Sequence, residues 1–216
     1  KLYDTPAYGV AFYHQSTVDN LLTRGLSLTF GIRYDYEHTS NDFLFYKETD
    51  GGSEQMDAFD SRLKFSQVTP KIALQYMFPS TGMLYATVTK GYKTGGFNTS
   101  FDREEDRTFR PETSWNYEFG AKHPFLDNRL NAEFCFFWID WKNQQIYQML
   151  ATQNGQYLRN AGRSESKGVE VSLQGNPVNG LMVQVNYGFT HATFKDYKDE
   201  RRGIDYSGNF LPMVPR

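Results

Sequence analysis

A two-residue alternation of side-chain polarity is the feature that most limits what this chain can fold into. In Leu26–Glu37 one side of the pattern is apolar throughout, with Leu26, Leu28, Phe30, Ile32, Tyr34 and Tyr36. The other side is polar or small, with Ser27, Thr29, Gly31, Arg33, Asp35 and Glu37. Successive side chains of a β-strand point to opposite faces, so this pattern predicts a strand with one apolar face. The same alternation recurs in 115–122, 130–138, 169–174 and 181–190, and less regularly in Pro6–Gln15, Lys64–Phe78 and Met83–Lys93. No segment shows a helical period, so the sequence predicts an all-β fold.

The lengths of the connections indicate which kind of β fold this is. Short or turn-like segments are Ser16–Gly25, Pro79–Gly82, Leu126–Arg129 and Asn176–Gly180. Longer polar segments lie between them: His38–Arg62, Phe97–Pro111, about Leu150–Gln156, and Lys195–Asn209. A soluble sandwich has no reason to alternate short and long connections, whereas an outer-membrane barrel has short turns on one side and long loops on the other. The pattern therefore favours an antiparallel transmembrane β-barrel, with a soluble β domain as the alternative.

Composition is consistent with this interpretation. The mean hydropathy is −0.64, yet aromatic residues make up 17% of the chain, which is too many large apolar groups for a disordered segment. Tyr34, Tyr36, Trp138 and Trp141 fall near predicted strand ends, where barrels place interfacial aromatic girdles. The net charge of −2 leaves no basic surplus of the kind that nucleic-acid binding requires.

The chain offers no recognisable catalytic or metal-binding constellation. Its four histidines are far apart, and Cys135 is the only cysteine, so neither a multi-cysteine zinc site nor an internal disulfide is expected. The acidic cluster Asp102–Asp106 is interrupted by Arg103 and reads as a solvated loop. We therefore expect no enzyme activity, no cofactor and no metal.

Several segments, in order along the chain, resemble one family. The run YATVTKGYKTGGFN at Tyr85–Asn98 is similar to a signature inside the barrel of TonB-dependent receptors. Its family motif comprises Gly91, Tyr92, Lys93, Gly95, Gly96, Phe97 and Asn98. Further matching segments are LTFGIRYD, FSQVTPKIALQY, RPETSWNYEFGAK, IDWKNQQI, NAGRSESKGVE and NFLPMVP. The motif lacks the spacing of a phosphate-binding loop, so its glycines are expected to permit a bend or the close approach of another backbone.

The resemblance implies a 22-stranded barrel in the outer membrane of a Gram-negative bacterium, with a plug domain in its lumen and coupling to TonB. It implies active uptake of a scarce nutrient such as a ferric siderophore or another iron chelate. Residues 1–216 would be part of that barrel, contributing about ten strands, with the plug and the final strands outside this chain. Import of an oligosaccharide or peptide, a passive porin, and a soluble β-sheet binding module remain alternatives.

The polar faces are the candidate functional surface. If the apolar faces meet lipid, the polar side chains point into the lumen, where they tune selectivity. The candidates are Arg33, Asp35, Asn116, Glu118, Lys122, Glu170 and Gln184. Most of them are expected to contact the plug or water, and only a few the substrate.

Overall fold

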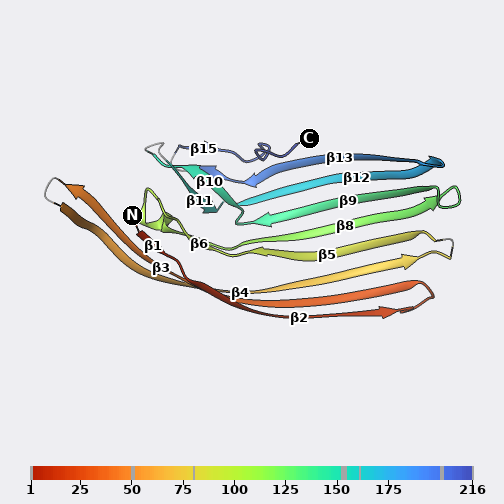
Figure 1. Ribbon diagram of the computed structural model, residues 1–216, viewed down its shortest axis with the longest axis horizontal. Helices are drawn as coiled ribbons and strands as arrows, with labels where there is room; N and C mark the ends of the chain where they lie inside the picture. The colour runs from red at the N-terminus through yellow and green to blue at the C-terminus, as the bar shows by residue number, and fades with distance from the viewer. Residues whose placement is uncertain are drawn as a thin grey trace.

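The computed structural model describes residues 2–49, 52–79, 81–151, 155–160, 162–199 and 202–215. It contains a nine-stranded antiparallel sheet in the order β1-β3-β4-β5-β8-β9-β12-β13, with β2 also paired to β3 (Figure 1). The strands of this sheet are β1 (Leu2–Asp4), β2 (Ala7–Asp19), β3 (Leu26–Thr49), β4 (Gly52–Met77), β5 (Met83–Lys93), β8 (Glu112–Phe125), β9 (Leu130–Lys142), β12 (Arg163–Val178) and β13 (Leu181–Asp196). The predicted all-β fold is confirmed, with nine strands in the sheet where about ten were expected.

The cross-strand register places apolar residues beside apolar residues. Phe30 lies opposite Ile72, and Val171 lies opposite Phe134. The result is an apolar face that runs across the sheet and is open to the surroundings: Phe30 is 46% exposed and Val185 57%. Monomeric soluble proteins rarely expose a continuous apolar band of this extent.

Short turns and long connections lie at opposite ends of the sheet (Figure 1). The short ones span 20–25, 78–82, 126–129 and 179–180, between consecutive strands. Left-handed backbone at Asn20, Thr81, Asn128 and Gly180 closes these turns, and such conformations are least costly for glycine and asparagine. The long connections all lie at the other end, which we call the loop end.

One predicted loop is largely strand. His38–Arg62 reads as a polar connection, but β3 continues to Thr49 and β4 starts again at Gly52, with pairing as far as Thr49 and Gly52. The backbone hydrogen bonds of a two-stranded ribbon do not require an apolar face, so alternation stops while the strands continue. The β3–β4 hairpin therefore projects beyond the rest of the sheet at the loop end (Figure 1).

Smaller elements fill the loop end. They are the two-stranded pairs β6 (Gly96–Phe97) with β7 (Thr108–Phe109), β10 (Gln145–Met149) with β11 (Gln156–Asn160), and β14 (Lys198–Asp199) with β15 (Ile204–Asp205), and the 3₁₀ turn η1 (Glu104–Arg107). Among the residues described, no helix is long and apolar enough to cross a membrane.

The buried core also lies at the loop end. Ala192, Phe194, Tyr197 and Leu211 form a buried cluster, and Ile146 and Tyr206 pack against it. In the part of the chain that the structure describes, the middle of the sheet is a single layer, and no second sheet or helix covers either face there. This part of the chain does not build a core of its own, and its two faces depend on what surrounds them.

The two edges of the sheet do not meet within the described residues. The order runs from β1 and β2 at one edge to β13 at the other. After β15 the chain returns beside the end of β13, where Phe194 N donates to Asn209 O at 2.9 Å and Leu211 N to Ala192 O at 3.0 Å. The chain then turns at Pro212 and Met213, where Met213 has a left-handed backbone. Within the described residues, β1 and β2 are therefore not paired with β13.

Candidate functional site

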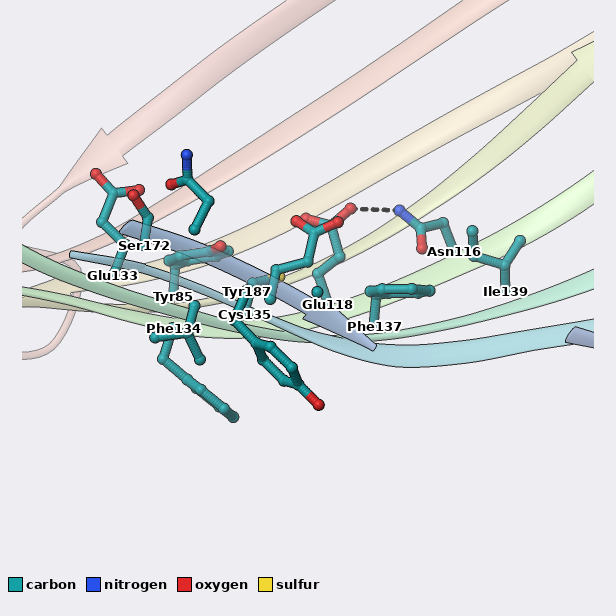
Figure 2. A pocket seen from close by; sticks show the side chains of 14 residues that line it. Tyr85, Asn116, Glu118, Glu133, Phe134, Cys135, Phe137, Ile139, Ser172 and Tyr187 are labelled. Atoms are coloured by element: carbon teal, nitrogen blue, oxygen red, sulfur yellow. Dashed lines mark hydrogen bonds between the residues drawn. The ribbon is translucent and has the colours of Figure 1, made fainter. Parts of the chain in front are cut away.

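The polar face of β5, β8, β9, β12 and β13 carries a hollow of about 670 Å³, which we call the polar-face hollow. Its lining includes Tyr85, Asn116, Glu118, Glu133, Phe137 and Glu170. Figure 2 shows Glu118 and Phe137 on one side of the sheet and Phe134 and Tyr187 on the other. The hollow thus occupies the face opposite the exposed apolar band.

Two glycines make room for the aromatic residues of this hollow. Tyr85 pairs with Gly120 across β5 and β8, and its ring lies where a Cβ of Gly120 would stand. Phe137 pairs with Gly168 across β9 and β12, and its ring would be 2.6 Å from a Cβ there. Each ring therefore covers the glycine of the neighbouring strand and lies flat along the wall.

The polar-face hollow is acidic. Asn116 Nδ2 donates to Glu118 Oε1 at 2.5 Å (Figure 2). Lys122 Nζ forms an ion pair with Glu133 at 2.9 Å. Within the described residues no ion pair joins Lys or Arg to Glu118 or Glu170. The sheet thus presents two carboxylates without a cationic partner on this face.

A second, smaller hollow of about 340 Å³ contains Arg33 and Asp35. Arg33 Nη2 lies 2.6 Å from Asp35 Oδ1, and Arg33 Nε also donates to the same carboxylate. Lys90 and Tyr92 of β5 line the hollow from the other side. The hollow lies where β4 and β5 are no longer paired, beyond Lys71 and Thr89, although both strands continue.

The predicted site residues thus fall into separate places. Asn116, Glu118 and Glu170 meet in the polar-face hollow, and Lys122 joins it through Glu133. Arg33 and Asp35 belong to the second hollow. Gln184 lies beside the first, with a long hydrogen bond of 3.4 Å to Asn186. Sequence reasoning missed Tyr85 and Phe137, although Phe137 interrupts the alternation of β9 by placing a large apolar side chain on the polar face.

The family motif lies where β5 leaves the sheet. A Cβ at Gly95 would meet the carbonyl oxygen of Phe109 and the ring of Phe65, and one at Gly96 would lie 2.9 Å from the Phe109 ring. The glycines therefore allow close approach of another backbone, as the sequence predicts. Asn98 is buried, and its side chain bonds to main-chain groups of two other segments.

The acidic residues of Asp102–Asp106 form hydrogen bonds and ion pairs with other parts of the protein. The Asp102 carboxylate accepts a hydrogen bond from Ala151 N at 3.1 Å, and buried Asp106 lies 4.0 Å from Arg159. Glu104 pairs with Arg107 at 2.7 Å. No group of three or more His, Cys, Asp or Glu is placed to hold a metal ion in the part of the chain that the structure describes.

A tyrosine-rich network connects β10–β11 to the segment after β13. Tyr157 hydroxyl donates to Gln148 Oε1 at 3.1 Å, and Gln148 Nε2 donates to Tyr197 hydroxyl at 3.2 Å and to Asp199 at 3.0 Å. Burial, with the neighbouring Asp199 carboxylate, raises the pKa of Tyr197. The phenol therefore stays protonated at neutral pH and remains compatible with that carboxylate.

Comparison with known proteins assigns this architecture. The family described as TonB dependent receptor-like, beta-barrel, matches residues 3–216. The pesticin receptor of Yersinia pestis is 27% identical over 198 residues, covering 90% of this chain and 27% of that protein. The probable TonB-dependent siderophore receptor PiuA of Acinetobacter baumannii is 24% identical, covering 92% of this chain and 27% of the relative.

Solved structures agree on the fold. The ferric yersiniabactin uptake receptor FyuA from Yersinia pestis superposes with a TM-score of 0.76 at 22% identity, over 99% of this chain and 30% of that one. The siderophore receptor PiuA from Acinetobacter baumannii gives a TM-score of 0.74 over 99% of this chain. This chain spans about a quarter of the length of these curated relatives. From the match over almost its full length, the chain belongs to the TonB-dependent receptor β-barrel family.

Proposed function

We propose that this chain is part of the wall of an outer-membrane receptor that imports an iron chelate, most simply a ferric siderophore, with energy delivered through TonB. The observation that carries the proposal is the family match over residues 3–216, together with relatives that are named as siderophore and pesticin receptors. The outer membrane of a Gram-negative bacterium is the location that this function requires.

The two faces of the sheet support a lipid-facing and a lumen-facing side. Burying apolar surface stabilises a protein by roughly 25 cal/mol per Å². The exposed apolar face gains this free energy only when it lies against hydrocarbon or another apolar surface. The opposite face carries Arg33, Asp35, Glu118 and Glu170, whose transfer to hydrocarbon would be costly. We therefore assign the apolar face to lipid and the polar face to the lumen.

The open edges support a larger barrel. A strand edge leaves unpaired N–H and C=O groups, and each costs several kcal/mol in hydrocarbon, so a spanning sheet must close. Within the described residues no strand covers the free edge of β2, nor Leu181–Thr190 of β13. We propose that residues 1–216 are one arc of a barrel of about 22 strands, as the resemblance implies, with a plug domain and further strands supplied from outside this chain.

The acidic polar-face hollow fits a lumen that contains other groups. Among the residues of the wall that the structure describes, none forms an ion pair with Glu118 or Glu170, so water or basic groups of the lumen contents would solvate them. In this proposal the wall contacts mainly the plug and water, while the loop end receives the chelate from outside.

The test is transport by the full-length receptor in a host that lacks its own iron-chelate receptors. Uptake of radiolabelled iron as a panel of ferric siderophores should appear with the receptor and disappear when TonB is deleted or the proton gradient is collapsed. Uptake that persists without TonB would overturn the proposal and support a passive porin. Uptake of oligosaccharides but of no iron chelate would replace the substrate class.

A further inference from the structure

We propose that Asn98 and Asn160 are positioning residues that join the β6–β7 and β10–β11 hairpins into one rigid unit, the loop-end plate. The plate consists of residues 96–110, 143–151 and 155–160. The inference concerns how the loops are held, so it stands apart from which nutrient the receptor carries.

Asn98 binds the main chain of β11 as a neighbouring strand would. Its Oδ1 accepts from Leu158 N at 2.8 Å, and its Nδ2 donates to Leu158 O at 2.8 Å. The same Nδ2 donates to Asp106 O, also at 2.8 Å. Since Asn98 is only 6% exposed, water cannot readily replace these three bonds, and leaving such buried groups unpaired is costly.

Asn160, at the end of β11, makes the equivalent bonds to the segment that follows β7. Its Oδ1 accepts from Arg110 N at 2.8 Å, and its Nδ2 donates to Arg110 O and to Asn143 O, each at 2.8 Å. Each asparagine amide therefore pairs with both backbone groups of one residue in the other hairpin. A side-chain amide has the same donor and acceptor as a peptide unit, so it substitutes for a missing strand.

Gln145 and Glu112 attach the plate to the barrel wall. Gln145 Nε2 donates to Thr94 O at 2.7 Å, where β5 leaves the sheet. The Glu112 carboxylate, at the start of β8, accepts from Gln145 N at 2.7 Å. The plate is thus fixed both to the family motif and to the next strand of the wall.

The hairpins need this support because they are short. β6 and β7 have two residues each, and β10 and β11 five, whereas isolated two-stranded hairpins are at best marginally stable in water. The Asp106–Arg159 ion pair and the hydrogen bond from Ala151 N to Asp102 also join them. We therefore expect these polar side-chain bonds to hold the two hairpins to one another.

The first test is hydrogen exchange on the full-length receptor in detergent. Asn98→Ala should speed exchange at least tenfold, not only in residues 97–109 and 156–160 but also in 143–149, which Asn98 does not touch. Asn160→Ala should loosen the same three segments. Exposed Asn131, at the opposite end of β9, supplies the control Asn131→Ala, which should leave all three unchanged. Loosening confined to the residues that each asparagine bonds would overturn the rigid unit.

The second test measures a distance across the plate, first with Asn98 and Asn160 unchanged. Spin labels at Arg103 and Tyr147, both exposed, would be placed in a receptor carrying Cys135→Ser. A narrow distance distribution is expected in the otherwise unchanged protein, and a broad one after Asn98→Ala. Asn98→Asp keeps the acceptor for Leu158 N but loses both donors, so its distribution should also broaden. A broad distribution before either Asn98 substitution would refute the proposal.

Discussion

Replacing Gly168 with alanine is the sharpest test of how the barrel wall is packed. Gly168 pairs with Phe137 on one side and Thr190 on the other. A new Cβ would meet the Phe137 ring and the carbonyl oxygen of Phe189. The ring can turn away, but the carbonyl belongs to the β12–β13 ladder and cannot move without disturbing it. Overpacking of this kind costs about 1–3 kcal/mol.

Gly31 supplies the matched control because it lies in β3, inside the same sheet and on the polar face. There a Cβ would find its nearest atom, Lys71 Cβ, at an ordinary 3.5 Å. Gly31→Ala should therefore stabilise the protein by about 0.4–1 kcal/mol, since it restricts only the unfolded chain. The two variants should differ by roughly 1.4–4 kcal/mol.

The assay is denaturant unfolding of the full-length receptor in detergent, in which the free energy of unfolding is compared at a constant slope. Gly120→Ala should fall between the other two, because its obstacle is the end of the Tyr85 side chain, which can rotate. Equal stability of Gly168→Ala and Gly31→Ala would refute the reasoning.

Three further predictions test the orientation and extent of the wall. Phe30→Lys or Val185→Lys should lower the free energy of unfolding by roughly 2–4 kcal/mol if the site is near the membrane midplane. Cysteines at these two sites should resist labelling by a water-soluble, lipid-excluded reagent. Ready labelling would contradict the assignment of the apolar face to lipid. Epitope tags in Phe97–Pro111 should be detected on intact cells and tags in Pro79–Gly82 should not, and the reverse result would invert the topology. An experimental structure of the full-length receptor should show β2 and β13 each paired with strands from outside this chain, whereas a ring closed between β2 and β13 would indicate a small porin.

The strands and their faces could be predicted because the backbone itself imposes the two-residue period. Phe30 and Ile72 lie on one face, and Arg33 on the other, whatever surrounds the sheet. The turns could be predicted equally well, since the left-handed backbone at positions such as Asn20 and Gly180 favours asparagine and glycine. Local rules of this kind act within a few residues, and a single sequence carries them in full.

The grouping of the site residues could not be predicted in the same way. Asn116, Glu118 and Glu170 meet because of the register of β8, β9 and β12, whereas Arg33 lies in another hollow. Whether a residue lies on the apolar or the polar face follows from its place in the alternation. Which residues of other strands lie beside it follows from the pairing between strands. The role of Asn98 was similarly hidden, because its partner Leu158 lies 60 residues away in a segment without alternation.

The order in which strands pair has a consequence for how such a wall assembles. Along the sheet from β3 to β13, each strand lies beside the next large strand in the chain. Most contacts between strands therefore join segments that are near one another along the chain. Closing the short loops between them costs little entropy and can be fast. The wall can lengthen one hairpin at a time, and only the last closure must bring distant segments together. We expect the slow step in folding the whole receptor to be that closure, together with the passage of the polar loop end across the bilayer.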